Sequence, residues 1–272
     1  MVCTLCGTPG ARAVLSLGEW RILRCAGCGL GWLDPRPEPS LLGELYDEAY
    51  FTRQGIMTAE SDEQMAAKIA GQSSRVRFVQ KFKPSGRLLD VGCASGHFLA
   101  RAREAGYEVR GLEVSDWAVS EGRKRLGLDI VHGTIETAGF AGSAFDAVTM
   151  WHVLEHFDDP VASLRKVRDW LESHGVLVLE CPNSGSFDAA KYGSEWAGWR
   201  IPYHFWHFTP KSLKLILERS GFAVQSVSTL RSQWMKEHMK RIPVLDFARN
   251  LIASFVSGRD MRVVAGPVKS HE

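Results

Sequence analysis

The feature that most constrains this chain is a regular alternation of short apolar runs with segments of helical periodicity, from residue 87 to residue 265. The apolar runs that have the length of buried strands are residues 87–91, 108–113, 129–131, 144–150, 175–180, 223–229 and 261–265. Helical segments fill most of the intervals, at residues 97–106, 115–126, 160–172, 210–220 and 233–257. This alternation predicts an α/β fold with a Rossmann-like, doubly wound, seven-stranded and mostly parallel sheet.

Two shorter parts precede this region. Residues 1–34 hold four of the six cysteines, and residues 35–62 form a linker that opens with alternating prolines. Proline fixes its backbone and lacks an N–H group, so this stretch is typical of an extended domain boundary. Within the linker we expect a short helix at residues 41–50 and a loop at 52–62. Residues 63–82 have a helical pattern and begin the third part, a domain predicted to span residues 63–272.

The first part contains two Cys-x2-Cys pairs, Cys3 with Cys6 and Cys25 with Cys28. This spacing predicts a small N-terminal zinc ribbon in which four thiolates complete a closed, structural, tetrahedral site. Each pair is followed by a glycine, which we expect to adopt a positive φ. Two disulfides or a redox Cys-x2-Cys pair are the alternatives, but a redox motif would lie beside a βαβ pattern and neither pair does.

Composition narrows the class of protein. Hydrophobic residues make up 45% of the chain, charged residues 24%, and the formal net charge is +2. These values indicate a globular protein and give no sign of a strongly basic nucleic-acid clamp, so a nucleic-acid partner is not expected. No apolar run reaches the roughly 20 residues of a transmembrane helix, and the N-terminus lacks the pattern of a signal peptide. We therefore expect a cytoplasmic protein, whose cysteines stay reduced.

A glycine loop follows the first strand of the large domain, where residues 88–99 read LLDVGCASGHFL. Asp90 ends the strand, Gly92 and Gly96 flank the loop, and Glu113 closes the next strand. A carboxylate at that second position accepts hydrogen bonds from the ribose hydroxyls of an adenosine cofactor. A dinucleotide dehydrogenase shares this much. The aspartate inside the loop favours a cofactor with a cationic ammonium and sulfonium end, because there is no pyrophosphate to bind.

With these residues the chain resembles class I S-adenosylmethionine-dependent methyltransferases, over about residues 63–270. Further similarities lie at residues 111–115, at 133–136 and at 145–156, the last of which ends in Leu-Glu-His. The resemblance implies S-adenosylmethionine as cofactor. The cofactor-binding residues that it implies are Asp90, Gly92, Cys93 and Gly96 around the methionine end, Glu113 at the ribose, Val114, Thr134 and Ile135 at the adenine, and Trp151 near the sulfonium. Ala94 stands where most members carry a second glycine, and it suits the loop if its φ is negative.

A long segment at residues 184–209, here called the acceptor loop, separates the fifth strand from the helix at 210. It contains Trp196, Trp199, Tyr203 and Trp206, with two histidines at His204 and His207. Long loops with their own aromatic residues are usually functional. In the family this stretch covers the acceptor pocket. We therefore expect His204 to act as general base with Tyr203 orienting it, and His156 as the second candidate. Alternatively, the loop histidines only anchor the loop.

A second constellation competes for the acceptor side. His152, Glu155 and His156 share one helical face if they form a turn, and His204 or His207 could complete a divalent-metal site. This resembles ubiquinone-pathway O-methyltransferases and small-RNA 2′-O-methyltransferases, in which a metal orients the acceptor hydroxyl. Here His152 stands where those enzymes have glutamate.

The N-terminal part is similar to that of bacterial sugar and natural-product methyltransferases. The expected function is therefore methyl transfer to a small-molecule, sugar or glycan-precursor acceptor. An RNA methyltransferase whose ribbon grips RNA and a non-catalytic cofactor-binding scaffold are the alternatives. In the helical insert at 233–257, apolar residues recur at helical spacing. That pattern indicates a packed core or a homodimer face, or else a membrane-surface contact.

Overall fold

The computed structural model describes residues 2–37, 61–239, 253 and 256–268. The expected helix at 41–50, nearly all of the loop at 52–62 and most of the insert at 233–257 lie outside these described residues. No helix in the described part of the chain has the length and apolar character needed to cross a bilayer.

The large domain contains a seven-stranded sheet in the order β10-β11-β8-β7-β4-β5-β6. Its strands are β4 (Gly86–Val91), β5 (Tyr107–Glu113), β6 (Ile130–His132), β7 (Phe145–Trp151), β8 (Leu171–Pro182), β10 (Phe222–Arg231) and β11 (Ser257–Pro267). Neighbouring strands from β8 to β6 are parallel, and only β11 pairs antiparallel, with β8 and with β10. The predicted fold class is confirmed.

The helices follow the predicted intervals with two differences. The described helices are α3 (Asp62–Gly71), α4 (Ser73–Gln80), α5 (His97–Glu104), α6 (Asp116–Leu126), α7 (Pro160–Trp170), α8 (Phe187–Tyr192), α9 (Pro210–Arg219) and α10 (Gln233–Met239). The pattern at 63–82 forms two helices, because the chain turns at Gln72, which ends α3 and begins α4. Helix α8 lies within the acceptor loop and was not predicted.

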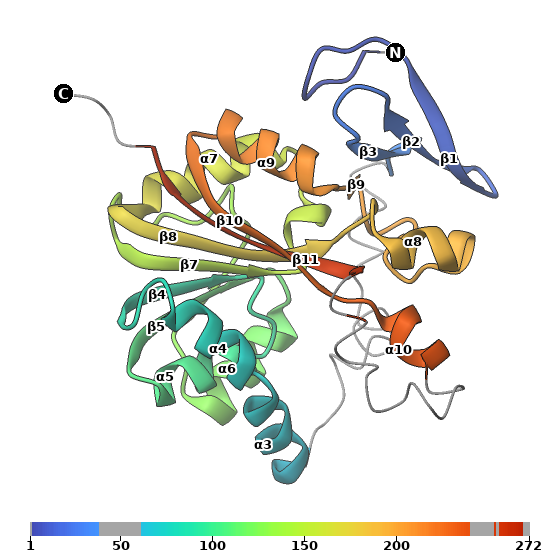
Figure 1. Cartoon of the computed structure of the whole chain (residues 1–272). Helices are drawn as coiled ribbons and strands as arrows, with labels where there is room; N and C mark the ends of the chain where they lie inside the picture. Colours follow the sequence, from blue (N-terminus) through green and yellow to red (C-terminus); the bar gives the residue numbers. More distant parts are fainter. Residues whose placement is uncertain (1, 38–60, 240–252, 254–255, 269–272) are drawn as a thin grey trace.

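Helices cover both faces of the sheet (Figure 1). Alternate strand residues point to opposite faces, so Leu88 joins the core beneath α4, α5 and α6, whereas Leu89 joins the core beneath α7 and α9. Strand β4 lies at the centre of this order, with β5 and β6 on one side of it and β7 and β8 on the other. The carboxyl ends of β4 and β7 therefore form the switch point at which such sheets bind ligands.

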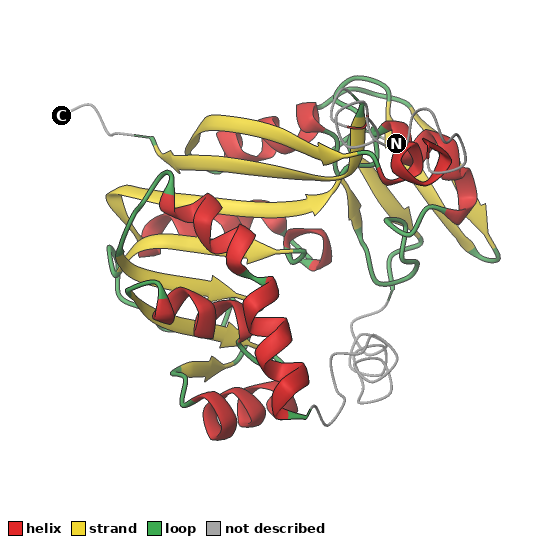
Figure 2. Ribbon diagram, turned by 60° about the horizontal axis from the view of Figure 1, so that its bottom comes forward, coloured by secondary structure: helices red, strands yellow, loops and turns green. Residues whose placement is uncertain are grey.

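The N-terminal part forms a second, four-stranded sheet in the order β1-β2-β3-β9. Three strands come from this part, β1 (Ala11–Leu17), β2 (Trp20–Cys25) and β3 (Gly31–Asp34), and β9 (Trp206–His207) comes from the acceptor loop. We call residues 2–34 the ribbon. In Figure 2 the ribbon lies beyond one end of the large sheet, the end at which the parallel strands of that sheet have their carboxyl ends. The sheet of the ribbon thus includes residues of the large domain, which the predicted boundary at residue 34 did not anticipate.

Candidate active site

The glycine loop after β4 has room only for glycine at two positions. Gly92 has a φ of +69° and Gly96 a φ of +84°. A Cβ atom on Gly92 would lie 2.6 Å from Val153 Cγ2, and one on Gly96 would lie 2.3 Å from Leu128 Cδ1. Both glycines are therefore required by backbone conformation, and a side chain at either position would also have to displace a neighbour.

Ala94 corrects the expectation of a negative φ. Its φ is +49°, in the left-handed region that alanine rarely occupies. The N–H of Ala94 donates a hydrogen bond of 2.8 Å to Oε2 of Glu113. This bond joins the glycine loop to the end of β5 and offsets part of the backbone strain.

Glu113 is buried at the end of β5, and three main-chain N–H groups hold its carboxylate. Oε1 accepts from Val114 and Ser115 at 2.9 Å each, and Oε2 accepts from Ala94. Burial raises the pKa of Glu113, while these hydrogen bonds act in the opposite direction. The carboxylate is therefore fixed in place beside the glycine loop, as a site for ribose hydroxyls requires.

Asp90 lies at the switch point, opposite Thr149 in the register between β4 and β7. Its side chain is 2% exposed, and Thr149 Oγ1 donates a hydrogen bond of 2.6 Å to Oδ1. Burial raises the pKa of Asp90 to about 7, against the effects of the Thr149 hydrogen bond and the charge of Arg75. A carboxyl group with this pKa attracts a cationic ligand more strongly above neutral pH.

The residues expected at the adenine differ in exposure. Val114, next to Glu113, is 51% exposed, which is unusual for a large apolar side chain at the end of a buried strand. Thr134 is also exposed. Ile135 is only 3% exposed and belongs to the core beneath α7, and Cys93 is buried as well. The exposed pair thus offers a surface for a flat ring, whereas Ile135 supports that surface from the core.

Trp151, at the end of β7, lies among charged groups that sequence reasoning missed. The guanidinium carbons of Arg75 and Arg262 lie 4.7 and 5.7 Å from its ring centroid. Both arginines also pair with Glu180, which is opposite Trp151 on β8. Burial alone would raise the pKa of Glu180, but His152 and Arg75 hold it well below its usual range. A glutamate within the apolar run of β8 was the signal for this cluster.

His152 belongs to this charged cluster and pairs with two carboxylates. Its backbone has a φ of +61°. Nε2 lies 3.1 Å from Oε1 of Glu180, and Nδ1 lies 3.6 Å from Oε1 of Glu155. Burial would lower the pKa of His152, but the two carboxylates raise it to about 9. His152 is therefore an imidazolium that bridges two carboxylates, and as such it has no lone pair for a metal.

The acceptor side brings together Glu155, His156 and His204. One ligand atom from each lies within 4.8 Å of the others, and Oε1 of Glu155 is 4.0 Å from Nε2 of His204. Glu155 comes from the 3-10 turn at Leu154–His156, and His204 from the acceptor loop, whose Phe205 N–H donates to the carbonyl of Glu155 at 2.9 Å. The structure thus joins two predicted catalytic residues with a carboxylate.

Hydrogen bonds to main-chain carbonyls determine which ring nitrogen of His156 and of His204 carries the proton. Nδ1 of His204 lies 2.9 Å from the carbonyl oxygen of Gly198, and Nδ1 of His156 lies 2.9 Å from that of Tyr203. A carbonyl oxygen only accepts, so each Nδ1 carries the proton and each Nε2 keeps a lone pair. Tyr203 thus positions His156 through its main chain. Burial lowers the pKa of both histidines, that of His204 well below its usual value.

The buried atoms of this site are mainly acceptors. Both carboxylate oxygens of Glu155 and Nε2 of His204 are buried and form no hydrogen bond with any described residue, although Nδ1 of His152 lies 3.6 Å from Oε1 of Glu155. Acceptors that face one another repel unless a proton or a metal ion lies between them. The site can therefore receive a cationic species. His207 lies beside it, in ring contact with Trp199 at 5.3 Å, and its Nε2 is likewise buried and unsatisfied within the described structure.

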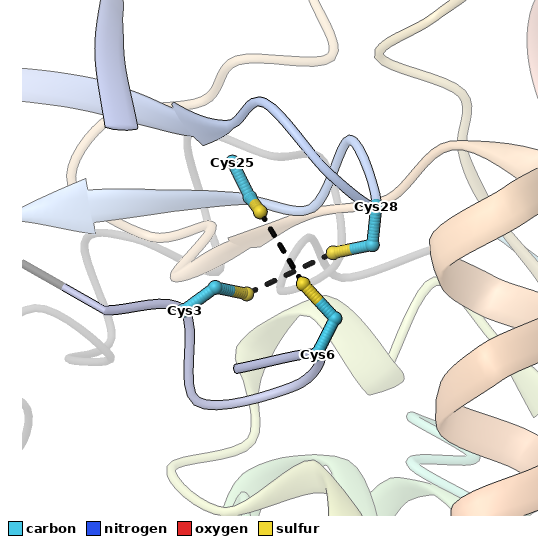
Figure 3. Close-up of side chains that lie close together, drawn as sticks. All are labelled: Cys3, Cys6, Cys25 and Cys28. Atoms are coloured by element: carbon cyan, nitrogen blue, oxygen red, sulfur yellow. Dashed lines mark hydrogen bonds between the residues drawn. The ribbon is translucent and has the colours of Figure 1, made fainter. Parts of the chain in front are cut away.

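The four cysteines of the ribbon converge as predicted (Figure 3). The Sγ atoms of Cys3 and Cys28 are 3.7 Å apart, and those of Cys6 and Cys25 are 3.5 Å apart. These distances are too long for disulfides and match the edges of about 3.8 Å in a tetrahedron with metal–sulfur bonds of about 2.3 Å. The glycines after the pairs, Gly7 and Gly29, have φ angles of +73° and +78°. The donor set thus fits zinc.

Sequence comparison places residues 61–227 in a family described as a methyltransferase domain. A ubiquinone biosynthesis O-methyltransferase of Dinoroseobacter shibae is 31% identical over 146 residues, which cover 50% of this chain and 59% of that protein. One of Xanthomonas axonopodis pv. citri is 29% identical over 168 residues, covering 57% of this chain and 70% of that protein. The match to the first relative thus spans less than two thirds of its length.

Solved structures share the fold. An S-adenosylmethionine-dependent methyltransferase of Thermotoga maritima superposes with a TM-score of 0.56 at 19% identity, over 80% of this chain and 97% of that chain. One of Archaeoglobus fulgidus gives a TM-score of 0.54 at 19% identity, over 80% of this chain and 99% of that chain. The family match covers more than half of the chain and includes the glycine loop, Glu113 and the acceptor-side turn. The chain belongs to the methyltransferase-domain family.

Proposed function

We propose that this enzyme methylates a hydroxyl group of a small-molecule acceptor, such as a sugar, a glycan precursor or a phenol. The observation that carries the proposal is the buried cluster of acceptor atoms on Glu155 and His204, at the carboxyl end of the sheet. A hydroxyl must lose its proton when it is methylated, and the acceptor atoms of Glu155 and His204 would take up that proton. The names of the O-methyltransferase relatives support the same chemistry.

The cofactor is proposed to lie across the carboxyl ends of β4 and β5 and to supply the methyl group. Asp90 would attract the ammonium and sulfonium charges, and Glu113 would accept hydrogen bonds from the ribose hydroxyls. Arg75, which pairs with Glu180 and whose charge acts on Asp90, would meet the carboxylate of the methionine end. The remaining residues proposed to line the site are Gly92, Cys93 and Gly96 in the loop, Val114, Thr134 and Ile135 at the adenine, and Trp151.

His204 is proposed as the general base. Its Nδ1 is held by the carbonyl of Gly198, so Nε2 keeps the lone pair that would take the proton from the acceptor hydroxyl. Because burial keeps the imidazole neutral near pH 7, it need not lose a proton first. The resulting imidazolium would be stabilised by the carboxylate of Glu155 at 4.0 Å. His156 is the second candidate, since it belongs to the same cluster.

A second mechanism is favoured by the same buried acceptors. Glu155, His156 and His204 together form a carboxylate and bis-imidazole set of the kind that holds a divalent cation. A cation there would lower the pKa of the acceptor hydroxyl, and His204 would then be a ligand. His152 is no part of this set, because both its ring nitrogens face carboxylates.

His204→Ala tests the role of the cluster, with turnover measured as S-adenosylhomocysteine release against a panel of sugars and phenols. We expect turnover to fall by about 10²–10⁴ with near-normal cofactor affinity. His174→Ala, at an exposed position of β8, is the matched control and should leave turnover unchanged. Sensitivity of the wild type to chelators, reversed by added magnesium or manganese, would favour the metal mechanism. Near-full turnover of His204→Ala would contradict both.

A further inference from the structure

Strand β9 lies between the ribbon and the candidate catalytic residues. Gly31 and Trp32 of β3 pair with His207 and Trp206 of β9. Next to this ladder, the N–H of Leu33 donates to the carbonyl of Phe205 at 3.0 Å. Phe205, which follows His204 in the acceptor loop, thus joins two parts of the molecule. Its carbonyl accepts a hydrogen bond from the ribbon, and its N–H donates one to the carbonyl of Glu155.

The cysteine end of the ribbon holds the other side of this segment. Lys211 Nζ donates to the carbonyl of Gly27, between Cys25 and Cys28, at 2.7 Å. A Cβ on Gly29 would lie 3.2 Å from Oγ1 of Thr209, so the turn packs against the start of α9. Phe208 is fully buried in one cluster with three of the ribbon cysteines.

A third contact comes from β2. Arg24 donates to the carbonyl of Ser184 at 2.8 Å, at the beginning of the acceptor loop. Ser184 in turn donates through Oγ to the carbonyl of Phe208 at 2.9 Å. The ribbon therefore reaches both ends of the acceptor loop.

The strands of the ribbon also pack on the acceptor loop, because Ile22 and Leu33 lie in one buried cluster with Trp196, Trp199 and Phe205. A pocket of about 500 Å³ separates Leu5 and Leu30 of the ribbon from Pro160 and Val161 of α7. None of the cofactor-binding or catalytic residues proposed above line this pocket. The contacts that attach the ribbon to the large domain thus lie mainly in the acceptor loop and at the start of α9.

We infer that the four-cysteine ribbon is a positioning element for the acceptor half of the active site and not for the cofactor half. When its sulfurs bind a metal, the turn at Cys25–Cys28 fixes β3, and β3 fixes the segment that presents His204. The glycine loop and Glu113 share no such contact with the ribbon, since they are held by β5 and by main-chain bonds. The catalytic meaning of this coupling rests on the proposed role of His204, but the coupling itself does not.

A substitution at Gly31 can disrupt the pairing between β3 and β9 while the four cysteines still bind their metal. A Cβ at this position would lie 2.9 Å from His207 Cβ and 3.3 Å from its carbonyl oxygen, so Gly31→Ala must push β3 and β9 apart. Gly139→Ala adds the same methyl group where no atom lies within 4 Å and serves as the matched control.

Hydrogen exchange of the full-length, zinc-loaded protein tests the inference without an acceptor, so a failure of the base assignment does not affect it. We expect Gly31→Ala, and wild type treated with a chelator, to exchange the amides of residues 203–208 about tenfold faster or more. The amides of β5 and the S-adenosylhomocysteine affinity from calorimetry should stay within about twofold, and Gly139→Ala should match the wild type. Unchanged exchange at 203–208 under both treatments would overturn the inference. So would equal loosening of β5, because the ribbon would then support the whole fold.

Discussion

Two residues other than glycine adopt left-handed backbone angles beside the site, Ala94 at +49° and His152 at +61°. Each is held by a contact with a buried carboxylate, Glu113 for the N–H of Ala94 and Glu180 for the ring of His152. Such conformations cost about 1–3 kcal/mol and persist only where surrounding contacts enforce them. The two turns that follow β4 and β7, next to the proposed cofactor and acceptor sites, therefore each hold a strained residue.

Asp90 predicts a pH dependence of cofactor binding. With a pKa of about 7, its carboxyl group is largely protonated below neutral pH and charged above it. The charged form attracts the cationic end of S-adenosylmethionine, with Arg75 and Glu113 as the charged neighbours that act on it. Affinity measured by calorimetry should therefore rise from pH 5.5 and level off above 7, with a limiting slope of about tenfold per pH unit.

The control for this titration is Asp90→Asn, which keeps the shape of the side chain and removes the charge. The variant should bind more weakly and show no rise over the same range. A wild-type affinity that is flat between pH 5.5 and 8 would show that Asp90 is not the group that senses the cofactor charge.

Among the individual residues, the sequence pointed to those that belong to a local pattern. It missed those that come from distant segments and are brought into contact by the fold. Asp90, Gly96 and Glu113 stand at fixed distances from strand ends, so the strand–loop–helix pattern identified them. Arg75, Glu180 and Arg262 come from α4, β8 and β11, and nothing in their spacing indicates that they surround one tryptophan.

At the scale of elements, the seven strands could be predicted because buried strands are continuous apolar runs. Helix α8 escaped prediction because it has only six residues, and its start depends on a Ser186 cap rather than on an apolar stripe. Strand β9 has only two residues and exists because β3 pairs with it. A pairing between parts of the chain some 170 residues apart leaves no local signal.

The ribbon predicts a metal content that can be measured directly. Protein purified without added zinc should contain about one zinc per chain by elemental analysis, because four converging thiolates form a closed site. Cys3→Ser should lose the metal and lower the thermal midpoint, since so small a segment has little apolar core of its own. Thr4→Ser, in the same turn, should keep both. Metal-free wild type with unaltered thermal stability would exclude a structural zinc.

As a whole, the molecule brings the proposed cofactor half and the proposed acceptor half to one end of the large sheet. The cofactor half is formed by the glycine loop, the end of β5 and Asp90, all within the sheet itself. The acceptor half is formed by the turn after β7 and by the acceptor loop, which the ribbon supports from outside. The residues of the first half follow a local sequence pattern, whereas those of the second come from three distant segments.

The measurement that tests the central claim most directly is calorimetric titration with S-adenosylhomocysteine and with NAD. The account predicts one S-adenosylhomocysteine per chain and no binding of NAD. Glu113→Ala should weaken binding about ten- to hundredfold, because the variant loses a charged hydrogen-bond acceptor worth about 1.5–3 kcal/mol. Binding of NAD without S-adenosylhomocysteine, or full affinity in Glu113→Ala, would contradict the account.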